Sequence, residues 1–462
     1  MPTHPSQPNA ARPTADAGTN PIPPGRYDIV ILGADRAARW AACEAASLGA
    51  RVAWLVGDAD GLPPAGVAAT TIDVYRGAPH FIASDALHLA GRRLHFVRAL
   101  IATGATPIVP PDSDIGAVPR LDAATPADLA SPPGRVAVIG AGATGCAAAQ
   151  GLARRGGRVT LFEAEGRVLP REAPEAAAAI QSALTADGVH VRTDHRVTTA
   201  VAQAGGWAFR GVTNAGTDSD ESFDDESFDA GPFDKVVLAA GRRSDMGALD
   251  LPAAAVETDG ARLRLDERLR TTNHRVYAAG DAALDHPSPH GAMACTRVAL
   301  RNALLDGRRR ADVLTIPRVV FTVPQLASVG LLAHEPEAAD VPLDTFVHRA
   351  EATAAPPNVS HAKDEVGVVA FHLAAGTDVL LGATLVGPDA AAAIGELAHA
   401  IDAGITLAEL GRAIRPPGVF ADAVRAVADE AHLRRRSPGN RALATRWLAA
   451  RRAWADRTAA RG

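Results

Sequence analysis

The sequence predicts an α/β protein with two doubly wound domains, followed by a C-terminal α+β domain. A strand–helix–strand unit begins at Tyr27, and the same order of elements returns at Arg135. In both units a glycine turn joins the first strand to the helix, which is typical of parallel strands covered by helices. Strands and helices alternate again from Ile316 to about His432, around an apolar helix expected at 390–403. The two repeated units and this third region predict the overall organisation.

Length and composition limit the class of protein. The 462 residues exceed one ordinary core and indicate roughly two to four domains. Apolar residues make up 47% and charged residues 21%, as in folded soluble proteins. The net charge of −5 provides no basic field that would attract nucleic acid, so we expect no nucleic-acid partner.

Cysteine usage and hydropathy narrow the cellular setting. Cys43, Cys146 and Cys295 lie too far apart in sequence to form a CxxC zinc site or a local redox pair, which favours a reducing cytoplasm. We therefore expect a cytoplasmic protein without a metal site. The longest uncharged run, 136–153, contains four glycines and changes from a strand pattern to a helix pattern, so we expect no membrane span. Residues 1–25 lack the apolar core of a secretory signal and are expected to form a disordered tail.

The first repeated unit leads from one short strand to another through an alanine-rich helix. The strands are expected at 28–32 and 51–56, and the helix is expected to end near Leu48. Short strands expected at 72–75 and 94–101 complete this domain.

The second unit contains a complete GxGxxG between a strand expected at 135–139 and a helix expected at 144–155. Gly140 permits the tight turn, Gly142 lets the backbone approach a pyrophosphate, and Gly145 lets the helix pack closely on the strand. The helix N-terminus supplies N–H donors and the positive end of a dipole. In this context the turn predicts a dinucleotide site.

The acid at the end of the next strand indicates which dinucleotide fits. Glu163 ends the strand expected at 158–163. Its carboxylate can accept a hydrogen bond from a ribose 2′-hydroxyl and would repel a 2′-phosphate. The second unit therefore predicts NAD(H) as its ligand, in preference to NADP(H).

The first unit keeps the spacing of the second but not its residues. Gly33 lies 23 residues before Val56, and in the second unit Gly140 lies 23 residues before Glu163. Asp35 takes the place of the second glycine, and a carboxylate near a phosphate costs on the order of 1–4 kcal/mol, which Arg36 or Arg39 would offset in part. Val56 takes the place of the acid and cannot hydrogen-bond a ribose. The first turn therefore retains the fold and loses most of the binding chemistry.

Four further motifs give the chain a resemblance to a known family. They are Ala102-Thr103-Gly104-Ala105, 239–243 with Gly241, 276–281 with Gly280 and Asp281, and 321–330. Together with the two glycine turns, they resemble the pyridine nucleotide-disulfide oxidoreductase family, which includes dihydrolipoamide dehydrogenase and mercuric reductase. The resemblance extends from about Tyr27 to Glu430.

The resemblance implies a role for each motif. The first motif closes an FAD domain, and the second closes an NAD domain. The third contains the aspartate that contacts the ribityl chain of FAD, a role implied for Asp281. The fourth opens a dimerisation domain in a form closest to mercuric reductases, which implies a homodimer. The implied domains are 26–130 with 245–312 for FAD, 131–244 for NAD, 313–432 for dimerisation, and an arginine-rich tail at 433–462.

The chain also departs from the family in ways that concern the reaction. The family's redox-active CxxxxC pair and its lysine follow the first unit, but no cysteine or lysine occurs from 57 to 100. The glutamate that partners this lysine falls on Ala147, and the C-terminal catalytic base falls on Pro417, with Asp422 in place of its carboxylate partner. Proline has no side-chain proton to transfer. These joint losses predict no disulfide or mercuric-ion reductase activity and leave no catalytic residue to name.

Two functions remain open. The first is a homologue that retains NAD(H) recognition without turnover. The alternative is a flavin-dependent NADH oxidoreductase of the diaphorase type, which passes electrons to a non-disulfide acceptor. NAD(H) binding is expected in both, whereas FAD binding is weakened. The expected cofactor-binding residues are Gly140, Gly142, Gly145, Glu163, Gly241, Gly33, Thr103, Gly104, Gly280 and Asp281.

Two segments fall outside these motifs. Residues 214–234 contain Asp-Glu-Ser-Phe-Asp twice in tandem and carry so much like charge that we expect a solvated hairpin insertion. In the terminal tail, Trp447 and Trp454 lie seven residues apart on one helical face. A docked or solvated helix is favoured there over contact with nucleic acid or membrane.

Overall fold

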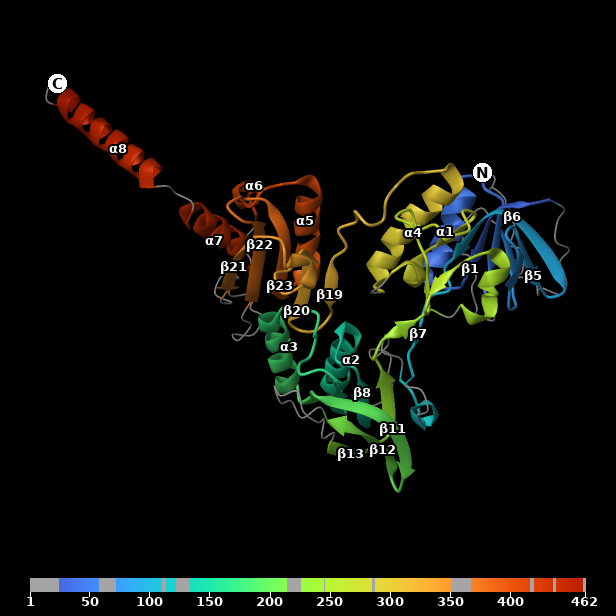
Figure 1. Ribbon diagram of the computed structural model, residues 1–462. Helices are drawn as coiled ribbons and strands as arrows, with labels where there is room; N and C mark the ends of the chain where they lie inside the picture. The colour runs from blue at the N-terminus through green and yellow to red at the C-terminus, as the bar shows by residue number, and fades with distance from the viewer. Residues whose placement is uncertain are drawn as a thin grey trace, which may run out of the picture. The chain divides into compact units, whose positions relative to one another are not determined.

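The computed structural model divides the chain into two compact units. Unit 1 comprises Met1–Val109 and Ala239–Ile316, and unit 2 comprises Pro110–Leu238 and Pro317–Gly462 (Figure 1). Each unit has its own sheets and buried cores. The residues described are 25–57, 72–109, 114–121, 133–213, 226–244, 246–284, 287–350, 367–415, 419–434 and 438–459.

A seven-stranded sheet forms the centre of unit 1. Its order is β3-β2-β1-β6-β5-β4, and β18 also pairs with β6. The pairs among β1, β2, β3, β6 and β18 are parallel, whereas β4 and β5 add antiparallel pairs. The strands are β1 (Tyr27–Leu32), β2 (Val52–Leu55), β3 (Ile72–Tyr75), β4 (His80–Ala83), β5 (Ala86–Leu89), β6 (Arg92–Ile101) and β18 (Val276–Ala278).

Helices α1 (Arg36–Ser47) and α4 (Pro289–Leu305) lie side by side on one face of this sheet (Figure 1). Ala38, Ala41 and Ala45 recur at intervals of three and four residues, so α1 presents a flat apolar face, which is fully buried. The opposite face of the sheet carries a second core. It contains, among others, Val30, Leu55, Phe81, Leu87 and Phe96.

Short elements complete unit 1. They are the antiparallel pair β7 (Thr106–Pro107) and β15 (Arg242–Arg243), the pair β16 (Thr258–Asp259) and β17 (Arg262–Leu263), and three one-turn helices at Gly247–Leu249, Leu251–Ala254 and Gly280–Ala283. The last of these directly follows β18 and therefore lies at the carboxyl edge of the parallel strands.

The first part of unit 2 is a parallel sheet with the order β10-β9-β8-β14. Helix α2 packs against β8 and β9, and α3 packs against β10. The elements are β8 (Arg135–Ile139), α2 (Ala143–Arg154), β9 (Arg158–Phe162), α3 (Pro174–Ala186), β10 (His190–Arg192) and β14 (Lys235–Leu238), preceded by a one-turn helix at Asp114–Ala117.

A three-stranded antiparallel sheet connects β10 to β14. Its strands are β11 (His195–Gln203), β12 (Gly206–Thr213) and β13 (Glu226–Phe233). The second acidic repeat begins at position 225, and all of it that the structure describes lies in β13. There the Phe228 ring stacks on Phe162, with centroids 5.8 Å apart and planes at 15°. Within the expected hairpin insertion, Glu226–Phe233 forms a strand paired with β12, in which Phe228 packs and Asp229 is exposed and forms an ion pair with Arg210; residues 214–225 lie outside the described residues.

A five-stranded antiparallel sheet and four helices form the rest of unit 2. The sheet has the order β19-β20-β23-β22-β21, and α5 packs on β20 and β23 (Figure 1). A one-turn helix, Pro336–Ala338, follows β20. The elements are β19 (Arg318–Val320), β20 (Gln325–Gly330), β21 (Leu343–Ala350), β22 (Gly367–Ala374), β23 (Leu380–Gly387), α5 (Ala390–Ala403), α6 (Leu407–Arg412), α7 (Val419–Arg434) and α8 (Pro438–Ala459).

The architecture agrees with the predicted fold class: two sheets built around parallel strands and covered by helices, and a C-terminal α+β part. Both strand–helix–strand units and the helix at 390–403 form where expected. The domain boundaries stay a prediction. The terminal helix expected around the two tryptophans is α8, in which Trp447 and Trp454 are 61% and 65% exposed. Among the described residues, no helix combines the length and the apolar character needed to cross a bilayer.

Candidate functional site

The second glycine turn leaves the N-terminus of α2 open. Gly140 has φ +97°, a conformation that favours glycine, and its N–H donates to the carbonyl of Phe162. Gly142 is the N-cap of α2 at φ −71°, ψ −174°, without a side-chain cap, and a Cβ there would meet no atom within 4 Å. Gly145 is buried in the first turn of the helix. The first N–H groups of α2 therefore face space that a ligand can enter.

Glu163 lies against this turn. Its side chain is largely buried, and one carboxylate oxygen accepts a hydrogen bond from the Ala141 N–H at 2.6 Å, while the other accepts from the Glu165 N–H at 3.1 Å. Each carboxylate oxygen has a second lone pair, so both retain acceptor capacity. The structure thus brings Gly140, Gly142, Gly145 and Glu163 together, as the sequence predicts.

The segment after Glu163 is held in place by an arginine that no sequence motif marks. The guanidinium of Arg167 donates to the carbonyls of Leu169, Pro170 and Glu172. The Leu169 N–H in turn donates to the carbonyl of Ala141 in the glycine turn. No motif signals this role, because the partners are backbone carbonyls.

Cys146, next to the turn, is a buried thiol. Its thiol is buried and donates to the carbonyl of Ala141 at 3.2 Å. Burial, and secondarily the negative charge of Glu163, raises the pKa of Cys146 to about 12. The thiol therefore stays protonated, and the thiolate is the reactive form.

In unit 1, Gly33 is required by close packing. It has φ +130°, and a Cβ there would lie 1.8 Å from the carbonyl oxygen of Ala102. The buried Trp54 donates from Nε1 to the Gly33 carbonyl at 2.8 Å. The first turn therefore has the expected backbone, held between two neighbouring strands.

The N-terminus of α1, in contrast, is closed by its own side chain. Asp35 is the N-cap at φ −71°, ψ 178°, almost the same angles as Gly142, and its Oδ1 accepts from the Ala38 N–H at 2.7 Å. Its Oδ2 lies 3.5 Å from the position that a Cβ would take on Gly104 or on Gly280. Both glycines have positive φ, +68° and +63°. The carboxylate thus lies at the meeting point of three turns.

Asp281 and Arg242 complete this site in unit 1. Arg242 lies 3.6 Å from the Asp281 carboxylate and also donates to the Ala105 carbonyl. Burial raises the pKa of Asp281, and Arg242 offsets part of this. Burial likewise raises the pKa of Asp35, the negative charge of Asp281 raises it further, and the Ala38 N–H opposes the shift. Asp281 is therefore paired with the guanidinium of Arg242, whereas that charge acts on Asp35 only at longer range.

The remaining predicted residues also lie in unit 1. Thr103 Oγ1 is buried and has no hydrogen-bond partner within the part of the chain that the structure describes. Gly241 has φ +123°, its carbonyl accepts from the Ile108 N–H, and a Cβ there would meet the Ile108 side chain at 3.1 Å. Val56 is only 3% exposed and belongs to the core under α1. Its apolar side chain packs at the position where the second unit presents Glu163.

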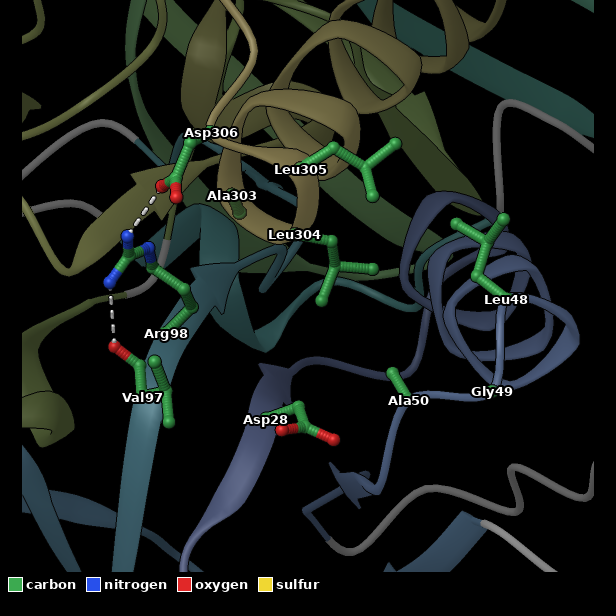
Figure 2. A pocket seen from close by; sticks show the side chains of 10 residues that line it. All are labelled: Asp28, Leu48, Gly49, Ala50, Val97, Arg98, Ala303, Leu304, Leu305 and Asp306. Atoms are coloured by element: carbon green, nitrogen blue, oxygen red, sulfur yellow. Dashed lines mark hydrogen bonds and ion pairs between the residues drawn. The ribbon is translucent and has the colours of Figure 1, made fainter.

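A groove of about 320 Å³ lies elsewhere in unit 1 (Figure 2). It is bounded by the C-terminal ends of α1 and α4 and by Asp28 near the start of β1, whereas the glycine turn follows the opposite end of β1. Arg98 and Asp306 form an ion pair of 2.7 Å on its wall. The groove is therefore distinct from both predicted dinucleotide turns.

Comparisons with known proteins place this geometry in a family. Residues 65–303 match the pyridine nucleotide-disulphide oxidoreductase model, and residues 316–428 match the dimerisation domain of the same family. The first glycine turn, with Asp35 and Val56, lies outside the matched residues.

Curated relatives and solved structures agree with these matches. A mercuric reductase from Streptomyces lividans is 32% identical over 332 residues, 71% of this chain and 66% of the relative. A dihydrolipoyl dehydrogenase from Thermus scotoductus is 31% identical over 303 residues, 65% of this chain and 62% of the relative. This chain thus covers slightly less than two thirds of the length of these relatives.

The HOCl-induced flavoprotein disulfide reductase RclA from Escherichia coli superposes with a TM-score of 0.73 at 22% identity, covering 87% of this chain and 99% of that one. At this identity the likeness shows the fold alone. The match to the family model extends over more than half of the chain. It shows that the chain belongs to the pyridine nucleotide-disulphide oxidoreductase family.

Proposed function

We propose that this chain is an NAD(H)-binding member of the family without disulfide or mercuric-ion reductase activity. The observation that carries the proposal is the contrast between two helix N-termini of nearly equal backbone geometry. Gly142 leaves one open, and Asp35 fills the other. An open helix N-terminus beside a glycine turn is a ready site for a pyrophosphate.

The residues of unit 2 fit the dinucleotide. The N–H groups at the start of α2 would bind the pyrophosphate, and a Cβ on Gly142 would fill the space in front of them. The Glu163 carboxylate would accept hydrogen bonds from the hydroxyls of the adenine ribose. When bound, NADH supplies a hydride; the chain's own residues supply binding and orientation.

The surroundings of Glu163 favour NAD(H) over NADP(H). Glu165, two residues further on, donates its backbone N–H to Glu163 and has an exposed side chain. The guanidinium of Arg167, the cation nearest in sequence, donates to three backbone carbonyls, which hold it on the segment after Glu163. A 2′-phosphate would meet the carboxylate of Glu163, which repels it.

The sequence lacks the thiol chemistry of the reductases. Thiol–disulfide exchange requires an accessible thiolate beside a second thiol. Burial raises the pKa of Cys146 to about 12 and that of Cys295 to about 11, and Cys43 is the remaining cysteine of the chain. Residues 58–71 lie outside the described residues and contain no cysteine, and Pro417 also lies outside them.

The experiment that tests the proposal is calorimetric titration with NADH and NADPH. We expect NADH to bind at least tenfold more tightly, because the 2′-phosphate faces the carboxylate of Glu163. Glu163→Gln should weaken NADH binding and reduce the ratio between the affinities for NADH and NADPH. Glu175→Gln, on the exposed first turn of α3, should change neither the NADH affinity nor this ratio. Equal affinities for the two nucleotides, or tighter binding of NADPH, would contradict the assignment.

A second function is favoured by the glycines and the aspartate retained in unit 1. Gly104, Gly280 and Asp281 still surround the flavin-type turn, which supports a flavin-dependent NADH oxidoreductase with a non-disulfide acceptor. A visible spectrum of the purified protein, recorded before and after FAD and then NADH, distinguishes the two. A flavin band bleached by NADH favours the second function, and no bound flavin favours the first.

We also propose a homodimer formed through the C-terminal part of the chain. The support is the match of residues 316–428 to the dimerisation domain and the exposure of apolar side chains on this part of unit 2. Phe321 is 63% exposed and Ile414 is 99% exposed. Sedimentation equilibrium of the full chain measures the oligomeric state directly.

A further inference from the structure

Asp35 occupies a position where the helix itself attracts an anion. The N-terminus of α1 has the positive end of a helix dipole and free N–H donors, and the Asp35 carboxylate accepts one of these at 2.7 Å. At the matching position of α2 there is no such carboxylate. The chain therefore supplies from its own sequence the negative group that a bound phosphate would supply.

The charges around this carboxylate do not suit a second anion. The charged groups acting on Asp35 are Asp281, from the one-turn helix after β18, and Arg242, from β15. Arg36 and Arg39 of α1 are exposed. Two carboxylates and one guanidinium leave one negative charge, to which the pyrophosphate of FAD would add about two more. The residues of unit 1 thus do not fit the pyrophosphate of FAD.

The space around Asp35 also does not fit the pyrophosphate of FAD. The Asp35 Oδ2 lies within ordinary contact distance of the Cβ positions of both Gly104 and Gly280, so its carboxylate fills the gap that these two left-handed turns create. In a dinucleotide site, glycines at such turns allow a ligand to approach the backbone. Here they accommodate an aspartate.

We propose that Asp35 is a built-in substitute for the flavin phosphate, which lets unit 1 fold without flavin and excludes dinucleotide from its turn while the carboxylate is ionised. This goes beyond the proposed function, which concerns the turn of unit 2.

The titration of Asp35 adds a testable consequence. Burial and the charge of Asp281 raise its pKa, and an added pyrophosphate would raise it further. Binding of FAD then takes up a proton at pH values between the pKa of the free protein and that of the complex. The affinity for FAD should therefore fall as the pH rises through this interval, by at most tenfold per pH unit, and be constant on either side.

The experiment compares the full-length protein with Asp35→Ser. Serine is also a good N-cap, so this variant removes the charge and keeps the helix start. We expect FAD to bind at least tenfold more tightly to Asp35→Ser at pH 7.5, and with a weaker pH dependence between pH 5 and 8 than in the wild type, where both Asp35 and Asp281 titrate. Riboflavin, which has no phosphate, should bind both proteins equally, since it does not meet the carboxylate. Quenching of flavin fluorescence measures the binding of FAD and of riboflavin to the wild type and to Asp35→Ser.

Two further variants keep the test decisive. If Asp35→Ser does not fold, Asp35→Asn replaces it, because the amide is nearly isosteric and neutral. Asp35→Gly with Val56→Glu restores the pattern of unit 2 and should bind FAD most tightly of all. NADH titration of each variant checks unit 2 separately and should give the wild-type affinity.

The proposal is overturned if the wild-type protein is purified with one FAD per chain. It is equally overturned if the folded neutral variants bind FAD no more tightly than the wild type, or if riboflavin affinity rises as much as FAD affinity. A failure of NADH binding alone would count against the proposed function and leave this inference intact.

Discussion

Gly142→Asp is expected to lower the affinity for NADH on the order of a hundredfold while leaving the fold intact. The substitution places in the second glycine turn the side chain that the first turn already has. The backbone angles are φ −71°, ψ −174° at Gly142 and φ −71°, ψ 178° at Asp35, so an aspartate needs no change of backbone.

The expected loss has two physical sources. A carboxylate a few ångströms from the pyrophosphate costs about 1–4 kcal/mol, and it also accepts the N–H that the phosphate would use. In the unliganded protein the same bond is favourable, because an aspartate N-cap stabilises a helix by roughly a few tenths of a kcal/mol more than a glycine N-cap. We therefore expect the melting temperature of unit 2 to stay constant or rise as NADH binding is lost.

This opposite change in stability and binding distinguishes the result from unfolding. Gly395→Asp is the matched control, since Gly395 is exposed on α5 and an added Cβ there also meets no atom within 4 Å. It adds the same charge to unit 2 and should leave NADH binding unchanged. Wild-type affinity in Gly142→Asp would show that the pyrophosphate does not lie at this helix, and the assignment of the second turn would be lost.

The sequence predicts backbones more fully than it predicts the functions of side chains. Strands, helices and glycine turns could be placed because apolar periodicity and glycine spacing are local properties. The Gly33 turn is an example: it forms as expected although Asp35 has replaced the second glycine. The fold of the turn depends on the first glycine and on the strands beside it.

The remaining features depend on contacts between distant segments. The capping role of Asp35 follows from its position before a helix, but its contact with the turns at Gly104 and Gly280 requires the folded sheet. The Arg167 brace has backbone carbonyls as partners, which leave no trace in sequence. Phe228 packs although the adjacent Asp229 is exposed, because successive residues of a strand point to opposite sides.

Glu172→Ala is expected to lower the free energy of unfolding of unit 2 by about 2 kcal/mol. The Glu172 side chain is 8% exposed, and its carboxylate accepts from Arg318 Nε at 3.0 Å and from Ser328 Oγ at 2.7 Å. It thereby joins the loop after β9 to β19 and β20. Burial alone would lower the pKa of Arg318, but the negative charges of Glu172 and Glu335 outweigh this and raise it.

The size of the effect follows from what remains after the substitution. Arg318 keeps its ion pair with Glu335 at 2.7 Å, and its side chain is 34% exposed, so the loss is smaller than for a fully buried pair. Ser328 is fully buried and loses its acceptor. Calorimetric unfolding measures the change, and Glu337→Ala, on the exposed start of the following one-turn helix, should alter stability by less than about 0.5 kcal/mol.

The contacts of Glu172 with Arg318 and Ser328 lie at one end of a loop that also reaches the nucleotide turn, so the loss of stability should also affect NADH binding. The loop from Glu163 to Glu172 also donates from the Leu169 N–H to the Ala141 carbonyl, so loosening one end should loosen the turn and weaken NADH binding several-fold. A double-mutant cycle of Glu172→Ala with Ser328→Ala should give a coupling above about 0.5 kcal/mol. Additive losses would mean that the two residues act independently, and unchanged NADH affinity would show that the loop does not support the turn.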